Sequence, residues 1–386
     1  MSLISPDNHI AVMAALFSLA GMAFLLERTR IGANLTGAVI AILGAILASN
    51  LKLIPHNAPA YGFVFTYFVP IIIPLFLFQA DLRRIIFEST RMTAAFLLAS
   101  VGTVAGVTVA ALVMDLSVLG AAAPLDAADR EPAIAGLFAA TYIGGSVNYA
   151  ALGELTGLQA DASFFSAATA ADNLFSAVYL GMLALMPGWL WLSRRYTPHN
   201  DEPPVEELTT GNITSMSLTL SLALSLLIVA FADFLVAWLQ LSGWRYVVIT
   251  ALCLCFATLA PAQARKLSGS FEIGVALSFV FFAAIAAGAD VVAMLSVAPM
   301  LIAMVLVLLS VHALVVFGLG MVFKLSLPEL IIASNAAVLG ATTAPALAAT
   351  KGWKNLVTPG ILVGVLGYAL GTFLGTLIYK YWGAIL

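Results

Sequence analysis

The chain has 386 residues, of which 62% are hydrophobic and only 9% are charged, and its formal net charge is −3. A soluble domain carries roughly a quarter charged residues, so this composition excludes an ordinary soluble protein and predicts an all-α integral membrane protein embedded in a lipid bilayer. The small negative charge argues against nucleic acid as a partner. The first residues, MSLISPDNH, lack basic side chains, so we expect the first apolar run to be a retained span rather than a signal peptide.

Apolar runs of about 20 residues, long enough to cross a bilayer, recur along the whole chain. Between two groups of such runs lies the segment 193–215, whose prolines and charges predict a solvent-exposed polar linker. The sequence therefore predicts about twelve transmembrane spans, to within one, in an N-terminal repeat over 1–192 and a C-terminal repeat over 216–386. The expected spans lie near 10–26, 32–51, 61–80, 92–115, 132–157, 163–192, 216–241, 244–263, 271–294, 297–323, 328–350 and 356–385.

Two of these spans, 132–157 and 328–350, are interrupted by glycines and small polar residues at corresponding positions of the two halves. A broken backbone survives in hydrocarbon only if it is buried in protein or lines a water-filled cavity. Paired interruptions are the best sequence indicator of the binding site of a secondary transporter. The interrupting residues that we expect to contact a substrate are Gly144, Gly145, Ser146, Ser334, Asn335, Thr342 and Thr343, with Asn148 as a further cation ligand.

The distribution of positive charge indicates how the two halves are oriented. Strict alternation through twelve spans divides the 16 Lys and Arg residues equally between the two sides, which is not how the positive-inside rule behaves. Inverting the second half concentrates most of them on one side and therefore favours an inverted repeat. Because spans six apart cannot be inverted, we expect the count of spans to be wrong by an odd number.

Asp172 lies inside the sixth apolar run and is followed by Asn173. A carboxylate within a membrane costs at least about 2.5–3.5 kcal/mol and usually marks an ion or proton path, although a hydrogen bond to a neighbouring helix near the interface also explains it. Hard cations such as Na⁺ take oxygen ligands, which hydroxyl groups and unwound carbonyls supply. Asp233 and His312 are further candidates for proton relay, with interhelical packing as the alternative for each.

The segments GGSVNYAALGELTG and AADNLFSAVYLGML, with PLFLFQADLRR upstream, resemble the DUF819 (YjcL-like) family of bacterial and plastid membrane proteins. That family is similar to the superfamily of cation/proton antiporters and anion transporters. The resemblance implies inverted repeats, two crossing discontinuous helices in a core domain, and a scaffold (panel) domain that often forms a homodimer. In the antiporters an Asp-Asp or Asn-Asp pair binds the cation. Asp172-Asn173 occupies the same place in reversed order, which implies Asp172 as the Na⁺ or proton ligand and leaves the role of Asn173 open.

These observations favour a secondary active transporter that works by alternating access in the bacterial inner membrane. We expect Na⁺ or H⁺ to be coupled to a small anionic organic solute, because helix N-termini at the two breaks favour negative charge. A cation/proton antiporter without organic cargo is the alternative, and a channel is a further one. The chain contains no H-E-x-x-H or G-x-S-x-G motif, so we expect neither an enzyme nor a cofactor other than a coupling Na⁺.

Overall fold

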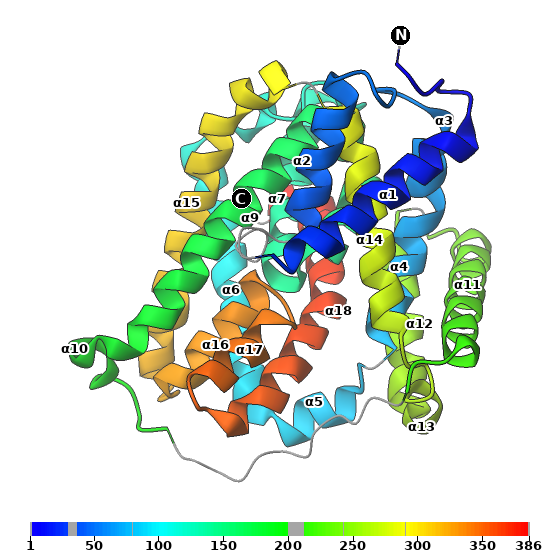
Figure 1. Cartoon of the computed structure of the whole chain (residues 1–386). Coiled ribbons are helices and arrows are strands. Elements are labelled where there is room, and N and C mark those ends of the chain that lie inside the picture. Colours follow the sequence, from blue (N-terminus) through cyan, green and yellow to red (C-terminus); the bar gives the residue numbers. More distant parts are fainter. Residues whose placement is uncertain are drawn as a thin grey trace.

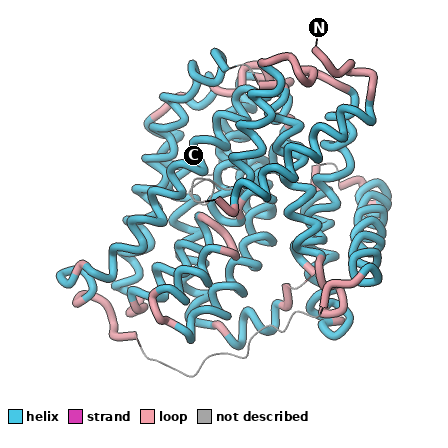
Figure 2. The backbone as a smooth tube through the Cα atoms, in the orientation of Figure 1, coloured by secondary structure: helices cyan, strands magenta, loops and turns pink. Residues whose placement is uncertain are grey.

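A computed structural model describes residues 2–29, 37–78, 80–199, 212–241, 243–289 and 291–384. Helices and the loops between them make up this part of the chain (Figure 1; Figure 2), apart from an isolated bridge between Thr197 and Ser326. Of the linker expected at 193–215, residues 200–211 lie outside the described residues. The prediction of an all-α protein is therefore confirmed.

Eight helical stretches are long and apolar enough to cross a membrane, which confirms a multi-pass membrane protein. They are α1 (His9–Glu27), Pro59–Leu77, α6 (Thr90–Val113), Ala162–Gly188 with α9 (Ala162–Leu185), α11 (Ser215–Trp238), α14 (Ser270–Ala287), Met294–Val322 within α15 (Val291–Val322), and Lys354–Ala384 with α18 (Val357–Tyr381). The stretch Pro59–Leu77 comprises α3 (Pro59–Phe63), a π-helical turn (Val64–Phe68) and α4 (Val69–Leu77). Two expected spans form shorter apolar helices, α2 (Gly37–Asn50) and α12 (Arg245–Leu259). The smaller helices α5 (Leu82–Glu88), α10 (Leu190–Ser193) and α13 (Pro261–Ala264) lie between spans.

The first interrupted segment forms two helices that fold back on one another. α7 (Ala127–Gly144) ends at Gly145, whose φ of +73° turns the chain into α8 (Ser146–Thr156). Both helices flank α18: a Cβ at Gly375 would lie 2.7 Å from the carbonyl oxygen of Gly136 in α7 and 3.2 Å from Leu152 in α8. Gly371, one turn earlier, likewise faces Ala140 and Asn148. The two arms therefore run antiparallel as the α7–α8 hairpin.

The second interrupted segment makes the same reversal. α16 (Leu327–Val338) is followed by Gly340, with φ +95°, and by α17 (Thr343–Thr350). A Cβ at Gly360 of α18 would lie 3.0 Å from Ile332 in α16 and 3.5 Å from Pro345 in α17. Figure 1 shows α16 and α17 side by side next to the first half of α18. They form the α16–α17 hairpin.

These hairpins correct the expectation of two discontinuous helices that continue through the core and cross. A chain reversal and a through-going break need the same residues, glycine and small polar side chains, so the sequence pattern does not separate them. The contacts with α18 do: from Gly371 to Gly375 the neighbours run backwards along α7, from Ala140 to Gly136, and forwards along α8, from Asn148 to Leu152. A helix that continued through the core after its break would not bring both arms against the same turns of α18.

The two hairpins start from opposite ends of the bundle. Near the end of α18, Trp382 donates a hydrogen bond to Glu131 in the first turns of α7, at 2.9 Å. Before the start of α18, Asn355 contacts His199, which also contacts Ser326 at the start of α16. The hairpin tips meet along the middle of α18, where Gly364 faces Ala341 and Gly367 faces Gly144. Three residues of helix rise place these two contacts about 4.5 Å apart along the axis of α18. We name the two ends of the bundle the α7–α8 end and the α16–α17 end.

Small residues allow these close approaches. The glycine stripe of α18 contacts both hairpins, and a Cβ at Gly106 of α6 would lie 2.5 Å from the carbonyl oxygen of Leu308 in α15. Glycine and alanine let helix backbones approach closely in membranes, where packing rather than hydrophobic transfer holds helices together. The core around the tips is therefore a tight, glycine-lined bundle of α6, α15, α18 and the two hairpins.

Candidate functional site

The hairpin tips present two exposed hydroxyl groups in the middle of the bundle. Ser146 is the first residue of α8 and Thr342 precedes α17, and both are exposed, whereas Val147 and Ala341 beside them are buried. Neither helix has a side chain that caps its N-terminus. Because the first N–H groups of a helix have no partner within the helix, the tips offer unpaired donors and partial positive charge at one level of the protein.

Asn148 is fully buried and holds the first tip together. Its Nδ2 donates to the carbonyl oxygen of Gly144 at 2.6 Å and to that of Gly367 at 3.5 Å. Its Oδ1 accepts a hydrogen bond from the hydroxyl of Thr372 in α18. All polar atoms of this side chain thus have protein partners, and the structure gives Asn148 the role of a clamp between the hairpin and α18.

Asn335 makes the corresponding clamp in the second hairpin. Its Oδ1 accepts from the hydroxyl of Thr343 at 2.7 Å, and its Nδ2 donates to the carbonyl oxygen of the same residue at 3.4 Å. Thr343 also donates to the carbonyl of Gly340 at 3.3 Å. The amide therefore ties the two arms across the turn and keeps Thr342 at the tip.

Asp172 lies in α9 at the level of the first tip and is only partly buried. The hydroxyl of Ser176, one turn further along α9, donates to its carboxylate at 3.3 Å. The hydroxyls of Tyr142 and Thr141 in the last turn of α7 also face this carboxylate. The Tyr142 hydroxyl is buried and has no hydrogen-bond partner among the described residues. A carboxylate and three hydroxyl groups therefore converge at the base of the tip.

Asn173, beside Asp172, donates to the carbonyl oxygen of Thr169 at 2.8 Å. Within the described residues, no three His, Cys, Asp or Glu side chains come together. Any cation held at Asp172 would consequently take its other ligands from hydroxyl and carbonyl oxygens, which suit a hard ion such as Na⁺.

Ser334 belongs to a buried hydrogen-bonded chain and is not exposed at the tip. Its hydroxyl contacts Tyr179 of α9 at 2.8 Å and Nε2 of His312 in α15 at 2.9 Å. Nδ1 of His312 contacts the hydroxyl of Thr103 in α6 at 3.0 Å, and Thr103 donates to the carbonyl oxygen of Tyr142 at 3.0 Å. This chain connects the arms of the two hairpins through α6, α9 and α15. Asp233, in contrast, is an exposed residue that pairs with Arg245 at 2.6 Å.

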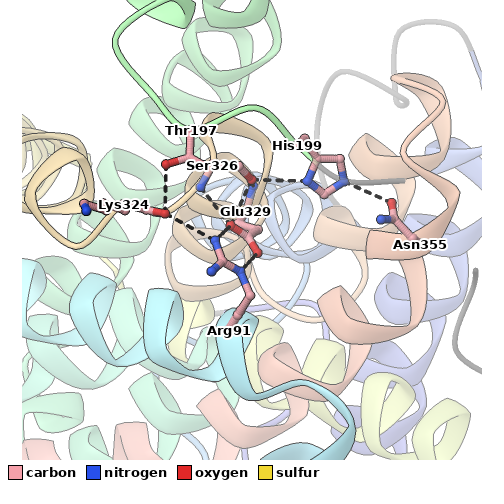
Figure 3. A network of polar contacts seen from close by, with 7 residues as sticks. All are labelled: Arg91, Thr197, His199, Lys324, Ser326, Glu329 and Asn355. Atoms are coloured by element: carbon pink, nitrogen blue, oxygen red, sulfur yellow. Dashed lines mark hydrogen bonds and ion pairs between the residues drawn. The ribbon is translucent and has the colours of Figure 1, made fainter. Parts of the chain in front are cut away.

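A second polar network closes the base of the α16–α17 hairpin (Figure 3). Arg91 of α6 reaches the mostly buried carboxylate of Glu329 with Nε at 2.7 Å and Nη2 at 3.0 Å. The same carboxylate accepts from the backbone N–H of Ser326 at 2.8 Å, which completes a capping box at the start of α16. His199 bridges Ser326 and Asn355 at 3.2 Å and 3.1 Å. These contacts fix both ends of the hairpin to each other.

The eight long apolar helical stretches define a multi-pass α-helical membrane protein. The family model described as "Protein of unknown function (DUF819)" matches residues 14–383, so the chain belongs to the DUF819 family. It is 32% identical over 407 aligned positions to the uncharacterized membrane protein YjcL of Bacillus subtilis (strain 168), and the alignment covers 100% of both chains.

The structure brings together some of the residues that the sequence singled out and adds others. Gly144, Gly145 and Ser146 lie at one tip, and Thr342 and Thr343 lie at the other. The residues that the structure adds around Asp172, and that the sequence pattern does not indicate as its ligands, are Thr141, Tyr142 and Ser176. The spacing of Asp172 and Ser176, four residues apart on one helix, is a signal that places both on one face. No local signal pairs Tyr142 with Asp172.

Proposed function

We propose that this protein is a secondary active transporter that works by alternating access and couples Na⁺ or H⁺ to a small anionic organic solute. One observation carries the proposal: two hairpin tips from opposite ends of the bundle meet at mid-depth beside Asp172. Irregular backbone at membrane depth is tolerated only where it is buried or lines a cavity, and transporters place their binding sites there.

The coupling ion would bind at Asp172. The carboxylate supplies negative charge, and Ser176, Thr141 and Tyr142 supply neutral oxygen ligands around it. The Tyr142 hydroxyl, which faces this carboxylate, would turn its oxygen to the bound ion. Protonation of the same carboxylate would compete with Na⁺, which gives one site for either coupling ion.

The organic solute would bind between the tips. The uncapped N-termini of α8 and α17 favour a negatively charged group, and Ser146 and Thr342 would donate hydrogen bonds to it. Tyr368 of α18 lies between the tips: its ring is 4.0 Å from a Cβ placed at Gly145, and its hydroxyl lies against the backbone of Ala341. We assign this ring to the floor of the solute site.

We further propose that residues 1–192 and 216–386 form inverted repeats joined by the linker 193–215. Each half would contain one hairpin and an odd number of crossings, which would invert the second half. The core domain would comprise α6–α9 and α15–α18, and the scaffold domain α1–α4 and α11–α14. A homodimer would form through the scaffold, as the family resemblance implies.

Positive charge favours the α16–α17 end as the cytoplasmic end in a bacterial inner membrane. Arg28 belongs to neither end, because it follows α1, whose last turn stacks Phe24 on Phe279 in the middle of α14. Ten described Lys and Arg residues lie at the α16–α17 end: Arg83, Arg84, Arg91, Arg194, Arg195, Arg265, Lys266, Lys324, Lys351 and Lys354. Four lie at the α7–α8 end: Lys52, Arg130, Arg245 and Lys380.

Ion-dependent stability of the purified protein in detergent tests the proposal. Thermal unfolding is followed while Na⁺, K⁺ or choline is added at several pH values to the wild type, Asp172→Asn and Asp233→Asn. A ligand at 100 times its Kd stabilises the folded form by about 2.7 kcal/mol. We expect a Na⁺-specific rise that weakens as the pH falls, is absent in Asp172→Asn and persists in Asp233→Asn, whose carboxylate pairs with Arg245. An equal Na⁺ response in Asp172→Asn would refute the assignment of the site.

A cation/proton antiporter is the second candidate, because the oxygen ligands around Asp172 would serve cation exchange without any solute. Flux in proteoliposomes separates the two. Proton movement driven by a Na⁺ gradient in the absence of organic anions would select the antiporter, whereas dependence on an added carboxylate would select the solute transporter. We propose no enzymatic activity for this site. Flux that ignores an opposing gradient would select a channel.

A further inference from the structure

A cavity of about 490 Å³ opens at the α7–α8 end of the bundle. It lies between the segment before and within α3 (His56 to Gly62), the last turns of α14 (Ala284 to Gly288) and the start of α9, including Ala162. Its volume falls in the range of small-molecule sites, about 300–1,000 Å³. The cavity therefore lies on the boundary between the proposed scaffold and core domains.

The polar side chains that line this cavity are two amides, an imidazole and the phenol of Tyr61, whose hydroxyl donates to the carbonyl oxygen of Pro55. His56, Asn57 and Gln159 line it, and its lining contains no Asp, Glu, Lys or Arg. Nε2 of Gln159 donates to Glu154, whereas its buried Oε1 has no hydrogen-bond partner among the described residues. A buried acceptor without a partner is unfavourable unless water or a solute meets it. The cavity thus suits a small, hydrogen-bonding solute and does not repel an anion through a carboxylate in its wall.

Aromatic rings close the inner side of the cavity. Phe65, in the π-helical turn, lines it and contacts Phe281 edge-on with ring centroids 5.9 Å apart. Phe281 contacts Phe165 of α9 at 6.4 Å, and Phe165 contacts Tyr149 of α8 at 4.1 Å. Phe281 and Phe165 are fully buried. We name Phe65, Phe281, Phe165 and Tyr149 the aromatic barrier.

The far side of the aromatic barrier is the Asp172 site. Tyr149 donates to the carbonyl oxygen of Phe165 at 2.7 Å and is close enough to Asp172 to interact electrostatically with it. The barrier joins four elements, the π-helical turn, α14, α9 and α8, which belong to the two domains that the proposed mechanism would move relative to one another. Phe65 and Phe281 belong to the proposed scaffold, and Phe165 and Tyr149 belong to the core.

We propose that this cavity is the outer access site for a small polar solute, and that the aromatic barrier separates it from the Asp172 site. The solute would reach Gln159 from the α7–α8 end and would pass inward when movement of the core parts Phe165 from Phe281. The identity of the solute as the transported anion rests on the proposed function. The path itself follows from the cavity and the ring contacts.

Cysteine accessibility tests the path in the full-length protein in lipid nanodiscs, where both faces meet the reagent. The background carries Cys253→Ser and Cys255→Ser, which removes the only cysteines. A small cationic methanethiosulfonate labels two reporter cysteines, and their labelling rates are compared. Ala160→Cys is exposed and lines the cavity, and Thr169→Cys is buried on α9 between Phe165 and Asp172. Because labelling of a buried site requires local opening, we expect Thr169→Cys to react at least about tenfold more slowly than Ala160→Cys.

Removal of the central ring should open the path. We expect Phe281→Ala to accelerate labelling of Thr169→Cys by about tenfold or more without changing that of Ala160→Cys. Phe282→Ala is the matched control, because this buried ring contacts Phe281 but has no ring contact with Phe65 or Phe165. Phe65→Ala, at the edge of the barrier, should act in the same direction as Phe281→Ala.

Equal acceleration by Phe281→Ala and Phe282→Ala would overturn the proposal, as would unchanged labelling of Thr169→Cys in both Phe281→Ala and Phe65→Ala. Cooperative thermal unfolding of each variant near the midpoint of the parent protein shows that the variants are folded. The assay requires neither Na⁺ nor an organic anion. A positive result would therefore stand even if the Na⁺ titration failed, and a negative result would remove the path without removing the Asp172 site.

Discussion

Gly371→Ala is the sharpest test of the packing that positions the site, because one added methyl group meets both arms of the α7–α8 hairpin. Its Cβ would lie 2.7 Å from the carbonyl oxygen of Ala140 and 2.8 Å from Cγ and Nδ2 of Asn148. Carbon and oxygen normally approach to about 3.3 Å. α18 and the hairpin would therefore have to separate by roughly half an ångström at the point where Asn148 joins them.

The cost follows from three contributions. Overpacking a tight core costs about 1–3 kcal/mol, and weakening the hydrogen bonds of Asn148 costs about 0.5–1.5 kcal/mol. Replacing a glycine within a helix by alanine stabilises the folded protein by about 0.5–1 kcal/mol, which offsets part of this cost. We therefore expect Gly371→Ala to destabilise the protein by roughly 1–3 kcal/mol and to weaken the Na⁺ response, since the displaced tip carries Tyr142.

The assay is reversible unfolding in mixed detergent micelles, with Gly181→Ala in α9 as the control. Gly181 also lies within a helix but has no described neighbour within 4 Å of its Cβ position. The control should gain about 0.5–1 kcal/mol. If Gly371→Ala were as stable as Gly181→Ala, the close contact between α18 and both arms would be refuted.

Three further substitutions probe the polar groups. Thr372→Val removes the donor to Oδ1 of the buried Asn148 and should cost about 1–3 kcal/mol in the same unfolding assay; stability equal to wild type would contradict the clamp. Arg91→Ala leaves the mostly buried Glu329 without its charged partner and should cost about 1–3 kcal/mol, with Arg91→Lys restoring part of it; no loss in Arg91→Ala would show that the pair contributes nothing. His312→Leu should lower stability by about 1 kcal/mol, because Thr103 and Ser334 each keep one other partner, and should leave the Na⁺ response intact; loss of that response would make His312 part of the ion path.

The sequence predicted the membrane class and the location of the helices because both depend on local composition. Runs of apolar residues have no stable place in water, and the glycines and hydroxyl groups at 144–146 and 340–343 mark where those runs are interrupted. The sequence also indicated Asp172 as an unusual carboxylate, since any charge in an apolar run is conspicuous. These signals require no knowledge of what the residues contact.

The distribution of positive charge favoured opposite orientations of the two halves, which conflicted with six spans in each half. Opposite orientation of the halves requires an odd number of crossings in each, whereas six apolar segments were counted. The hairpins account for this difference: in each half one interrupted segment enters the bundle and returns without crossing it. Under the proposed inverted arrangement, the distribution of positive charge is therefore a signal in the sequence that the two halves have opposite orientations.

Only the tertiary structure decided that the chain reverses at Gly145 and Gly340, that Tyr142 faces Asp172, and that Asn148 is a clamp. Each depends on groups far apart in the chain, and Thr372 and Asn148 are 224 positions apart. A glycine permits a positive φ but does not impose one, so packing against α18 selects the reversal. The sequence by itself therefore determined which residues are able to break a helix or carry a charge in the membrane. The packing of distant helices decided how those residues meet.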